Sequence, residues 1–228
     1  MQSQYLPASD PTDFSLMSEG RVVELLLEMV EKCLAVFPQH LRAIEDYDEM
    51  ASELFFNSEF SHTFQTVVQK SGFHGCTFHD ESASLEHLMG IKKKKGIPPR
   101  VDLGIRLVHK RDRIMLVEGK RLHNPSDKQY VSGDTGGIAR FKQEQHGADV
   151  EVACMVGYVQ TNTFAFWHEK VNAWIRGEAA PAAVPNWDES DCLNPLIVKA
   201  DHLTQCLSQH RRINKEPIGL HHFWVRVI

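Results

Sequence analysis

Two strand-like runs joined by a short basic segment constrain the fold of this chain more than any other feature. The first run, residues 100–107, alternates polar and apolar side chains. The second, residues 113–120, contains the continuous apolar stretch 114–117 and is typical of a buried central strand. The basic segment 110–112 lies between them. The runs therefore predict an antiparallel hairpin in which Asp102 and Glu118 are cross-strand neighbours.

Such a hairpin would carry the groups of a metal site. Glu118 and Lys120 are two residues apart, so on a strand their side chains leave the same face. Two carboxylates are hard oxygen ligands for a magnesium-like ion, and the lysine could orient or deprotonate water or stabilise charge on a phosphate. The alternative is an ordinary hairpin whose charges are solvated. The apolar run that leads directly into Glu118 favours a site, because a charge at a buried strand needs a partner.

The pattern resembles that of the PD-(D/E)XK, or restriction-endonuclease-like, nucleases. It reads Pro99-Arg100-Val101-Asp102, fifteen residues, then Glu118-Gly119-Lys120, with the proline displaced from its usual place before the aspartate. The resemblance covers about residues 73–160. It implies an α/β fold with an αβββαβ core and a mixed central sheet, here with extra N-terminal helices. It also implies phosphodiester hydrolysis with Mg²⁺ or Mn²⁺, with Asp102 and Glu118 as metal ligands and Lys120 positioning or activating water.

Two further residues are candidates for supporting roles. A helix is expected from Tyr47 to about Lys70, stopped by Ser71-Gly72, and Glu53 lies on its apolar stripe. Related nucleases often take a further metal ligand from this helix, which makes Glu53 a candidate accessory ligand. The alternative is a first-turn acid stabilised by the helix dipole. Gln160, at the end of an apolar strand expected over 150–160, could also reach the site.

A concentration of basic residues around the motif indicates a polyanionic partner. Residues 91–123 hold eleven Lys or Arg against three Asp or Glu, a net charge of +8 in a chain whose net charge is −5. We expect DNA to be bound by this stretch, although a solvated loop is the alternative for its lysine run. A helix expected at 138–146, opened by Gly136-Gly137, could add a phosphate contact. The candidate DNA-binding residues are Lys92, Lys93, Lys94, Lys95, Arg121 and Arg140.

The rest of the chain divides into a loose N-terminal arm, residues 1–17, and one nuclease-like domain, residues 18–228. Elements expected outside the motif are a helix from Ser18 to about 36 that Pro38 ends, a first core strand at 73–80, a loop at 122–135, a helix at 164–175 with Trp167 and Trp174 on one face, a short helix at 203–207 and a terminal strand at 218–228.

Composition narrows the class of protein. No run approaches the ~18 apolar residues of a membrane span, and the N-terminus has no signal-peptide pattern, so we expect a cytoplasmic protein without a membrane partner. Five cysteines without a CxxC pair favour reduced thiols. His74, Cys76 and His79 lack a fourth zinc ligand. Motifs of serine hydrolases and P-loop NTPases are absent.

The leading hypothesis is a Mg²⁺-dependent DNA endonuclease. Small nucleases of this type resemble effectors of bacterial restriction or anti-phage defence, an analogy at the level of fold. Because no separate specificity domain is visible, sequence choice would come from loops, from a homodimer partner or from a companion protein. The competing hypothesis is a non-catalytic nucleic-acid-binding or assembly subunit that kept the fold. RNA is the alternative target.

Overall fold

The computed structural model describes residues 17–80, 102–108, 113–133, 136–179 and 185–228. The described helices are α1 (Glu19–Arg42), α2 (Glu53–Lys70), α4 (Gly137–Lys142) and α5 (Phe164–Glu178), with 3₁₀ turns η2 (Lys128–Tyr130) and η3 (Glu189–Asp191). The strands are β1 (Cys76–Asp80), β2 (Leu103–Leu107), β3 (Arg113–Leu122), β4 (Val152–Val159), β5 (Ile197–Ala200), β6 (Leu203–His210) and β7 (Ile218–Arg226).

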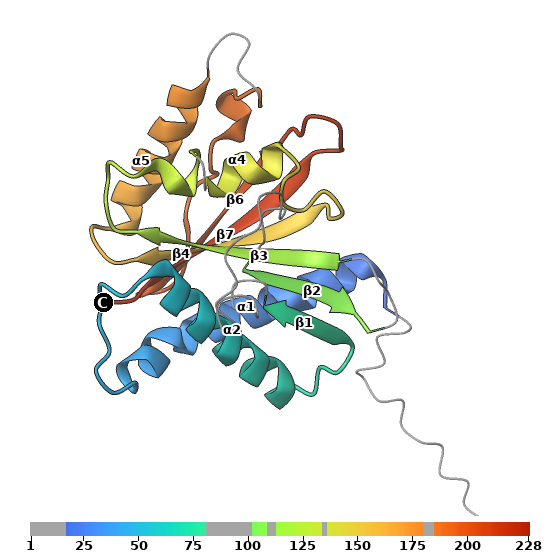
Figure 1. The fold of residues 1–228 in the computed structure, drawn as a ribbon, viewed down its shortest axis with the longest axis vertical. Coiled ribbons are helices and arrows are strands. Elements are labelled where there is room, and N and C mark those ends of the chain that lie inside the picture. Colours follow the sequence, from blue (N-terminus) through green and yellow to red (C-terminus); the bar gives the residue numbers. More distant parts are fainter. Residues whose placement is uncertain (1–16, 81–101, 109–112, 134–135, 180–184) are drawn as a thin grey trace, which may run out of the picture.

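The architecture is mixed α/β, with one seven-stranded mixed sheet between two helical layers. Figure 1 shows α1 and α2 on one face of the sheet and α4 and α5 on the other. The strand order is β1-β2-β3-β4-β7-β6-β5. Strands β1, β2 and β3 form an antiparallel meander, β4 is parallel to both β3 and β7, and β7, β6 and β5 are again antiparallel. The predicted α/β class is therefore confirmed.

The predicted hairpin of residues 100–120 is confirmed as β2 and β3. Leu103 pairs with Val117, so the residue before β2, Asp102, comes opposite Glu118. The first strand is shorter than expected because β2 begins at Leu103, and the turn at 109–112 lies outside the described residues.

The central strands bury both of their faces, which explains their apolar runs. Along β4, Cys154, Val156 and Tyr158 belong to the core beneath α1 and α2. Ala153 and Met155 belong to the core beneath α4 and α5. The alternation follows from the period of two along a strand, and on β3 it directs Gly119 toward α2 and its neighbours Glu118 and Lys120 toward α4.

Helix α1 begins as predicted but ends later. Ser18 is its N-cap, and its side chain accepts the N–H of Arg21. The prediction that Pro38 ends this helix is wrong, because α1 continues to Arg42 with Pro38 inside it. Proline removes one intrahelical hydrogen bond. Burial of Leu41 one turn later and a bond of 3.1 Å from Arg42 Nε to the Pro38 carbonyl hold the last turn in place.

Other boundaries also move. Helix α2 starts at Glu53 rather than Tyr47, because Ser52 caps it by accepting the N–H of Phe55. It stops at Ser71 and Gly72 as predicted, with Gly72 at φ +72°. Helix α4 stops at Lys142 rather than at 146, and the expected loop at 122–135 starts one residue late and contains η2.

The predicted short helix at 203–207 is wrong, since these residues form β6 between β5 and β7. The face of β6 that points into the protein is largely polar. The alternation of apolar and polar residues that marks a strand is therefore missing from its sequence. Thr204, Ser208 and His210 are buried together with Cys206. Strand β5, which was not predicted, pairs with β6 at the edge of the sheet.

Ser208 and His210 of β6 belong to one chain of buried hydrogen bonds beneath α4 and η2. The contacts are Lys142 Nζ to Asp191 (2.6 Å), Asp191 to His210 Nδ1 (2.7 Å), His210 Nε2 to Ser208 (2.6 Å), Ser208 to His222 Nε2 (2.7 Å), His222 Nδ1 to Tyr130 (2.9 Å) and Trp224 Nε1 to Tyr130 (2.8 Å). We call this set the buried polar chain. It fastens α4, η2 and η3 to the sheet.

Within the described part of the chain, no helix combines the length and apolar character needed to span a bilayer. The cysteines Cys33, Cys76, Cys154, Cys192 and Cys206 are all free thiols.

Candidate active site

The candidate site forms where β2 ends beside β3. Beyond Val117, the last residue paired with β2, the backbone of β3 continues and needs other hydrogen-bond acceptors. Two carboxylates supply them. Asp102 Oδ2 accepts the N–H of Gly119 at 2.7 Å, and Glu53 Oε2 accepts the N–H of Arg121 at 3.3 Å. The amides that β2 leaves unpaired thus hold two acids beside the strand.

Lys120 is the centre of the charged cluster. Its Nζ lies 2.8 Å from Glu53 Oε1 and 2.8 Å from Glu118 Oε1, and it donates to the Gly119 carbonyl at 3.1 Å. The side chains of Lys120 and Glu118 are 5% and 2% exposed, while that of Glu53 is 32% exposed. Glu53 is the first-turn acid of α2, as one of its two alternatives has it, and a partner of Lys120; its role as an accessory metal ligand stays a prediction.

The electrostatics of the cluster follow from burial and proximity. Burial, followed by the charge of Glu118, raises the pKa of Asp102 well above its ordinary value. Burial alone would also raise the pKa of Glu118, but Lys120 and then His146 outweigh it and lower that pKa to about 2. Burial opposes the charged form of Lys120, yet Glu118, Glu53 and Asp102 together raise its pKa. The cluster therefore favours a charged Lys120 beside a charged Glu118.

Two further residues contact Glu118. The sequence did not assign His146 to the site, and it assigned Arg140 to DNA binding. His146 Nδ1 lies 3.4 Å from Glu118 Oε2, and Arg140 Nη1 lies 3.9 Å from Glu118 Oε1. Arg140 was expected to contact a phosphate. In the structure its side chain extends from α4 toward Glu118. No motif marks His146, because it reaches Glu118 only through the shape of the turn after α4.

Gly119 lets the opposite layer approach closely. A Cβ at this position would lie 1.9 Å from Asn57 Oδ1 and 2.9 Å from both Asn57 Cγ and Tyr158 Cε2. Asn57 belongs to α2 and is 5% exposed. Glycine therefore allows α2 to pack against β3 and brings Glu53 within reach of Lys120.

Gln160 and Arg121 tether the segment that leads into α2. Gln160 Nε2 donates to the carbonyls of Glu49 (2.7 Å) and Ala51 (3.3 Å), and Arg121 Nη1 donates to the carbonyl of Ala51 at 3.1 Å. These contacts fix the start of the helix that carries Glu53. Gln160, expected to reach the site itself, supports it through this backbone.

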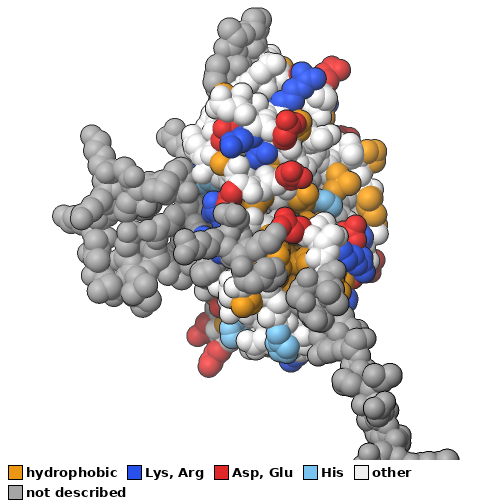
Figure 2. Space-filling model, turned by 90° about the vertical axis from the view of Figure 1, so that its right-hand side faces the viewer, with side chains coloured by type: hydrophobic (Ala, Val, Ile, Leu, Met, Phe, Trp, Pro, Cys, Tyr) orange, Lys and Arg blue, Asp and Glu red, His pale blue; other side chains and the backbone are white. Residues whose placement is uncertain are grey.

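Of the six candidate DNA-binding residues, the four lysines of the run 92–95 lie outside the described residues. Arg121 and Arg140 are both engaged in contacts within the protein. Figure 2 shows a face on which the basic and acidic side chains of the described residues are interspersed rather than separated by sign.

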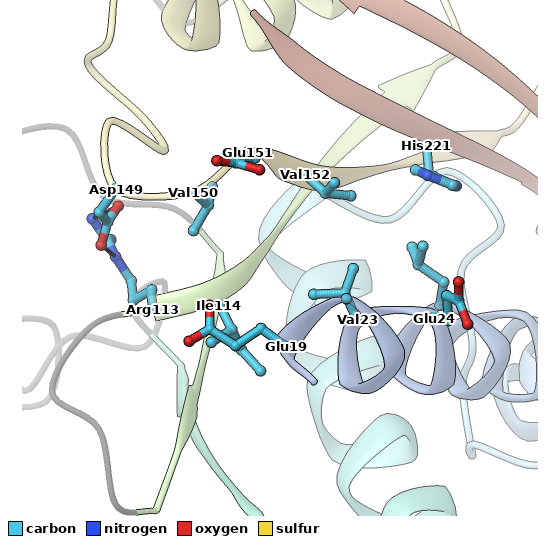
Figure 3. Close-up of a pocket in the computed structure, with 12 residues that line it drawn as sticks. Glu19, Val23, Glu24, Arg113, Ile114, Asp149, Val150, Glu151, Val152 and His221 are labelled. Atoms are coloured by element: carbon cyan, nitrogen blue, oxygen red, sulfur yellow. Dashed lines mark hydrogen bonds and ion pairs between the residues drawn. The ribbon is translucent and has the colours of Figure 1, made fainter. Parts of the chain in front are cut away.

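A small hollow of about 180 Å³ adjoins the cluster and is lined by Glu53, Arg121, His123, Asp127 and Gln129. A second hollow, of about 520 Å³, lies between the N-terminal half of α1 and the strands β3 and β4 (Figure 3). Its lining includes Glu19 and Glu24 and the ion pair of Arg113 with Asp149 at 2.8 Å. None of the predicted site residues lines the second hollow.

The buried polar chain contains another arrangement that sequence reasoning missed. Asp191, His210 and Ser208 contact one another in the order found in serine hydrolases, over 2.7 and 2.6 Å. However, Ser208 is 6% exposed and its hydroxyl contacts two imidazoles, those of His210 and His222. The hydroxyl is therefore closed to substrate, and the arrangement is structural.

Among the described residues, no group of three or more His, Cys, Asp or Glu side chains is arranged to hold a metal ion. The expectation that His74, Cys76 and His79 form no zinc cluster stays a prediction, because the side chain of His79 lies outside the described part. Neither a scan against protein-family models nor searches of curated proteins and of solved structures found a match to the chain.

Proposed function

We propose that this protein is a metal-dependent nuclease that hydrolyses phosphodiester bonds in DNA, and that it is an endonuclease. The observation that carries the proposal is the convergence of Asp102, Glu118 and Lys120, with Glu53, at the end of the β2–β3 hairpin. An ordinary solvated hairpin would leave these charges in water. Here Glu118 and Lys120 are almost completely buried against each other, which is costly unless the charges serve a purpose.

The order of elements supports the same proposal. Helix α2 is followed by the meander β1-β2-β3, then by α4, and then by β4 parallel to β3. An αβββαβ core, which the motif implies, has this order. Helix α1 and strands β5, β6 and β7 would be additions to that core.

The donor set suits Mg²⁺ or Mn²⁺. Mg²⁺ is usually bound by one or two carboxylates together with water and substrate phosphate, not by a cage made of protein alone. Asp102 and Glu118 would be those carboxylates, with Glu53 as the accessory ligand. Glu118 Oε2 is closed to solvent and has no hydrogen-bond partner, which leaves an acceptor for a cation.

In the proposed reaction each residue has a defined task. The metal would act as a Lewis acid on the phosphate and as a source of nucleophilic water. The Gly119 amide holds Asp102 in place through its N–H. Lys120, positioned by Glu53 and Glu118, carries N–H donors that can stabilise charge on a phosphate oxygen or orient water. The basic stretch 91–123 would hold the DNA backbone.

The proposal is tested with purified full-length protein, supercoiled and linear DNA, Mg²⁺ or Mn²⁺, and EDTA controls. We expect metal-dependent cutting that falls at least ~100-fold in Glu118→Ala and Lys120→Ala. Lys199→Ala is the matched control, because it removes a lysine at the far edge of the sheet, paired with Glu31 at 2.9 Å. Cutting of closed circles would identify an endonuclease.

Other outcomes would favour other functions. DNA binding without cleavage by the wild type would favour the alternative of a non-catalytic nucleic-acid-binding or assembly subunit. Metal-dependent cleavage of RNA but not DNA would change the substrate while keeping the site. Cleavage that persists unchanged in both site variants would contradict the assignment of Glu118 and Lys120. A role in restriction or anti-phage defence, acting as a homodimer or with a companion protein, is part of the proposal and rests on fold-level analogy alone.

A further inference from the structure

Beside Glu118, the buried imidazole of His146 contacts the partly buried side chain of Arg140. The side chain of His146 is fully buried. Its Nδ1 lies 3.4 Å from Glu118 Oε2, and its Nε2 lies 3.4 Å from Arg140 Nη1. Both Nδ1 and Oε2 are closed to solvent, and neither makes a hydrogen bond of normal length to any described residue. The two atoms are therefore close enough to become hydrogen-bond partners of each other.

Arg140 decides which nitrogen of His146 carries the proton. A guanidinium group only donates hydrogen bonds, so the imidazole nitrogen that faces it must accept. This assigns the lone pair to Nε2 and the proton to Nδ1, which faces the Glu118 carboxylate. Arg140 thus acts on Glu118 in two ways, through the tautomer of His146 and through its own charge at 3.9 Å.

The ring of His146 is fixed by the turn that ends α4. Glu144 adopts φ +61°, and the N–H of His146 donates to the Arg140 carbonyl at 3.2 Å. Phe141 packs edge-on against the ring, with centroids 5.8 Å apart. These contacts hold the imidazole in place independently of Glu118. A catalytic hydrogen bond is often long before substrate binds and shortens in the complex.

We propose that His146 is a positioning residue that donates through Nδ1 to Glu118 and orients this carboxylate toward a divalent cation, and that Arg140 fixes the required tautomer. The inference rests on the proposed function. Groups that hold a metal ligand from behind commonly change metal affinity or activity 10- to 100-fold when they are lost. An ionised carboxylate offers about four lone-pair sites, so His146 at Oε2 and Lys120 at Oε1 would still leave sites on Glu118 for the cation.

The test compares three replacements of His146 in the full chain. His146→Asn keeps an N–H donor close to the position of Nδ1, His146→Gln moves the donor toward the position of Nε2, and His146→Leu removes it. Isothermal titration with Mn²⁺ measures metal affinity without DNA, and cleavage assays over a range of metal concentrations give kcat and the KM for DNA. His168→Asn is the control, because His168 lies on α5 and bonds the carbonyl of Asn194.

We expect the Gln and Leu variants to bind Mn²⁺ about 10- to 100-fold more weakly and to lose kcat, with little change in the KM for DNA. His146→Asn should stay within about threefold of the wild type, and Arg140→Leu should weaken metal binding less than His146→Leu. Urea unfolding of each variant identifies those that fold, and the Asn and Gln pair alone carries the comparison if the Leu variant does not.

Equal metal affinities for the Asn and Gln variants, whether both normal or both reduced, would overturn the positioning role of His146. If the wild type still binds Mn²⁺ and cleaves DNA, that result leaves the nuclease proposal standing. A wild type that neither binds Mn²⁺ nor cleaves nucleic acid would remove the proposed function, and the role of His146 with it.

Discussion

Gly119→Ala should destabilise the protein by pressing α2 away from the sheet. The added methyl group would lie 1.9 Å from Asn57 Oδ1 and 2.9 Å from Tyr158 Cε2, where ordinary contacts are 3.4 Å or more. Both neighbours are buried, so neither can turn into solvent. Overpacking of this kind costs about 1–3 kcal/mol. In a domain of this size that corresponds to a loss of about 2–12 °C in Tm.

The double variant with Asn57→Ala separates the clash from other effects. Removing the Asn57 amide eliminates two of the three nearest atoms, including the closest, and leaves the contact with Tyr158. The cost of Gly119→Ala should therefore fall by at least half in the Asn57→Ala background, a coupling of about 0.5–1.5 kcal/mol. Gly177→Ala is the control, since no atom lies within 4 Å of a Cβ there, and alanine should be neutral or slightly stabilising in a helix.

Urea unfolding followed by circular dichroism measures all four proteins of this cycle. A Gly119→Ala variant as stable as the wild type, or one equally destabilised in both backgrounds, would refute the packing argument. The same substitution should also disturb the site, because Asp102 and Lys120 both bond the backbone of Gly119.

Two further predictions concern the buried polar chain. Lys142→Met should lower the free energy of unfolding in urea by about 3–5 kcal/mol, because it leaves the buried carboxylate of Asp191 without its ammonium partner. Arg113→Ala, the control at a partly exposed ion pair, should lower it by less than ~1 kcal/mol. Similar losses in the two variants would contradict this account. Burial lowers the pKa of His210 and His222 below their ordinary value near 6.5. Their contribution to stability is therefore complete above pH ~6.5 and is lost as pH falls, by up to ~2.7 kcal/mol per pH unit for the two histidines together. A urea midpoint that does not change between pH 7.5 and 5.5 would exclude this effect.

The hairpin and the positions of its two acids could be predicted from the sequence. An alternating run, a turn and an apolar run define β2 and β3, and the register then follows, so Asp102 and Glu118 come together. The N-cap Ser18 was also predicted correctly, because a capping signal depends on only a few adjacent residues. The position of Glu53 on the apolar side of α2 was sufficient to direct it toward the sheet.

Other features depended on contacts between distant residues. His146 reaches Glu118 only because Glu144 adopts a left-handed conformation that ends α4 early, and nothing in the local pattern requires this. Pro38 was expected to end a helix, but burial of the following turn outweighs the lost hydrogen bond. Strand β6 was missed because its inward face consists largely of polar groups whose partners lie in η3 and β7.

The buried polar chain from Lys142 to Trp224 restricts how this sequence can diverge. Each of its inner members has a partner on both sides, so a single apolar replacement leaves at least one buried group without a hydrogen bond. Intermediate sequences would therefore be less stable than either a complete polar set or a complete apolar one. We expect descendants of this protein to keep these residues as a block or to lose them as a block.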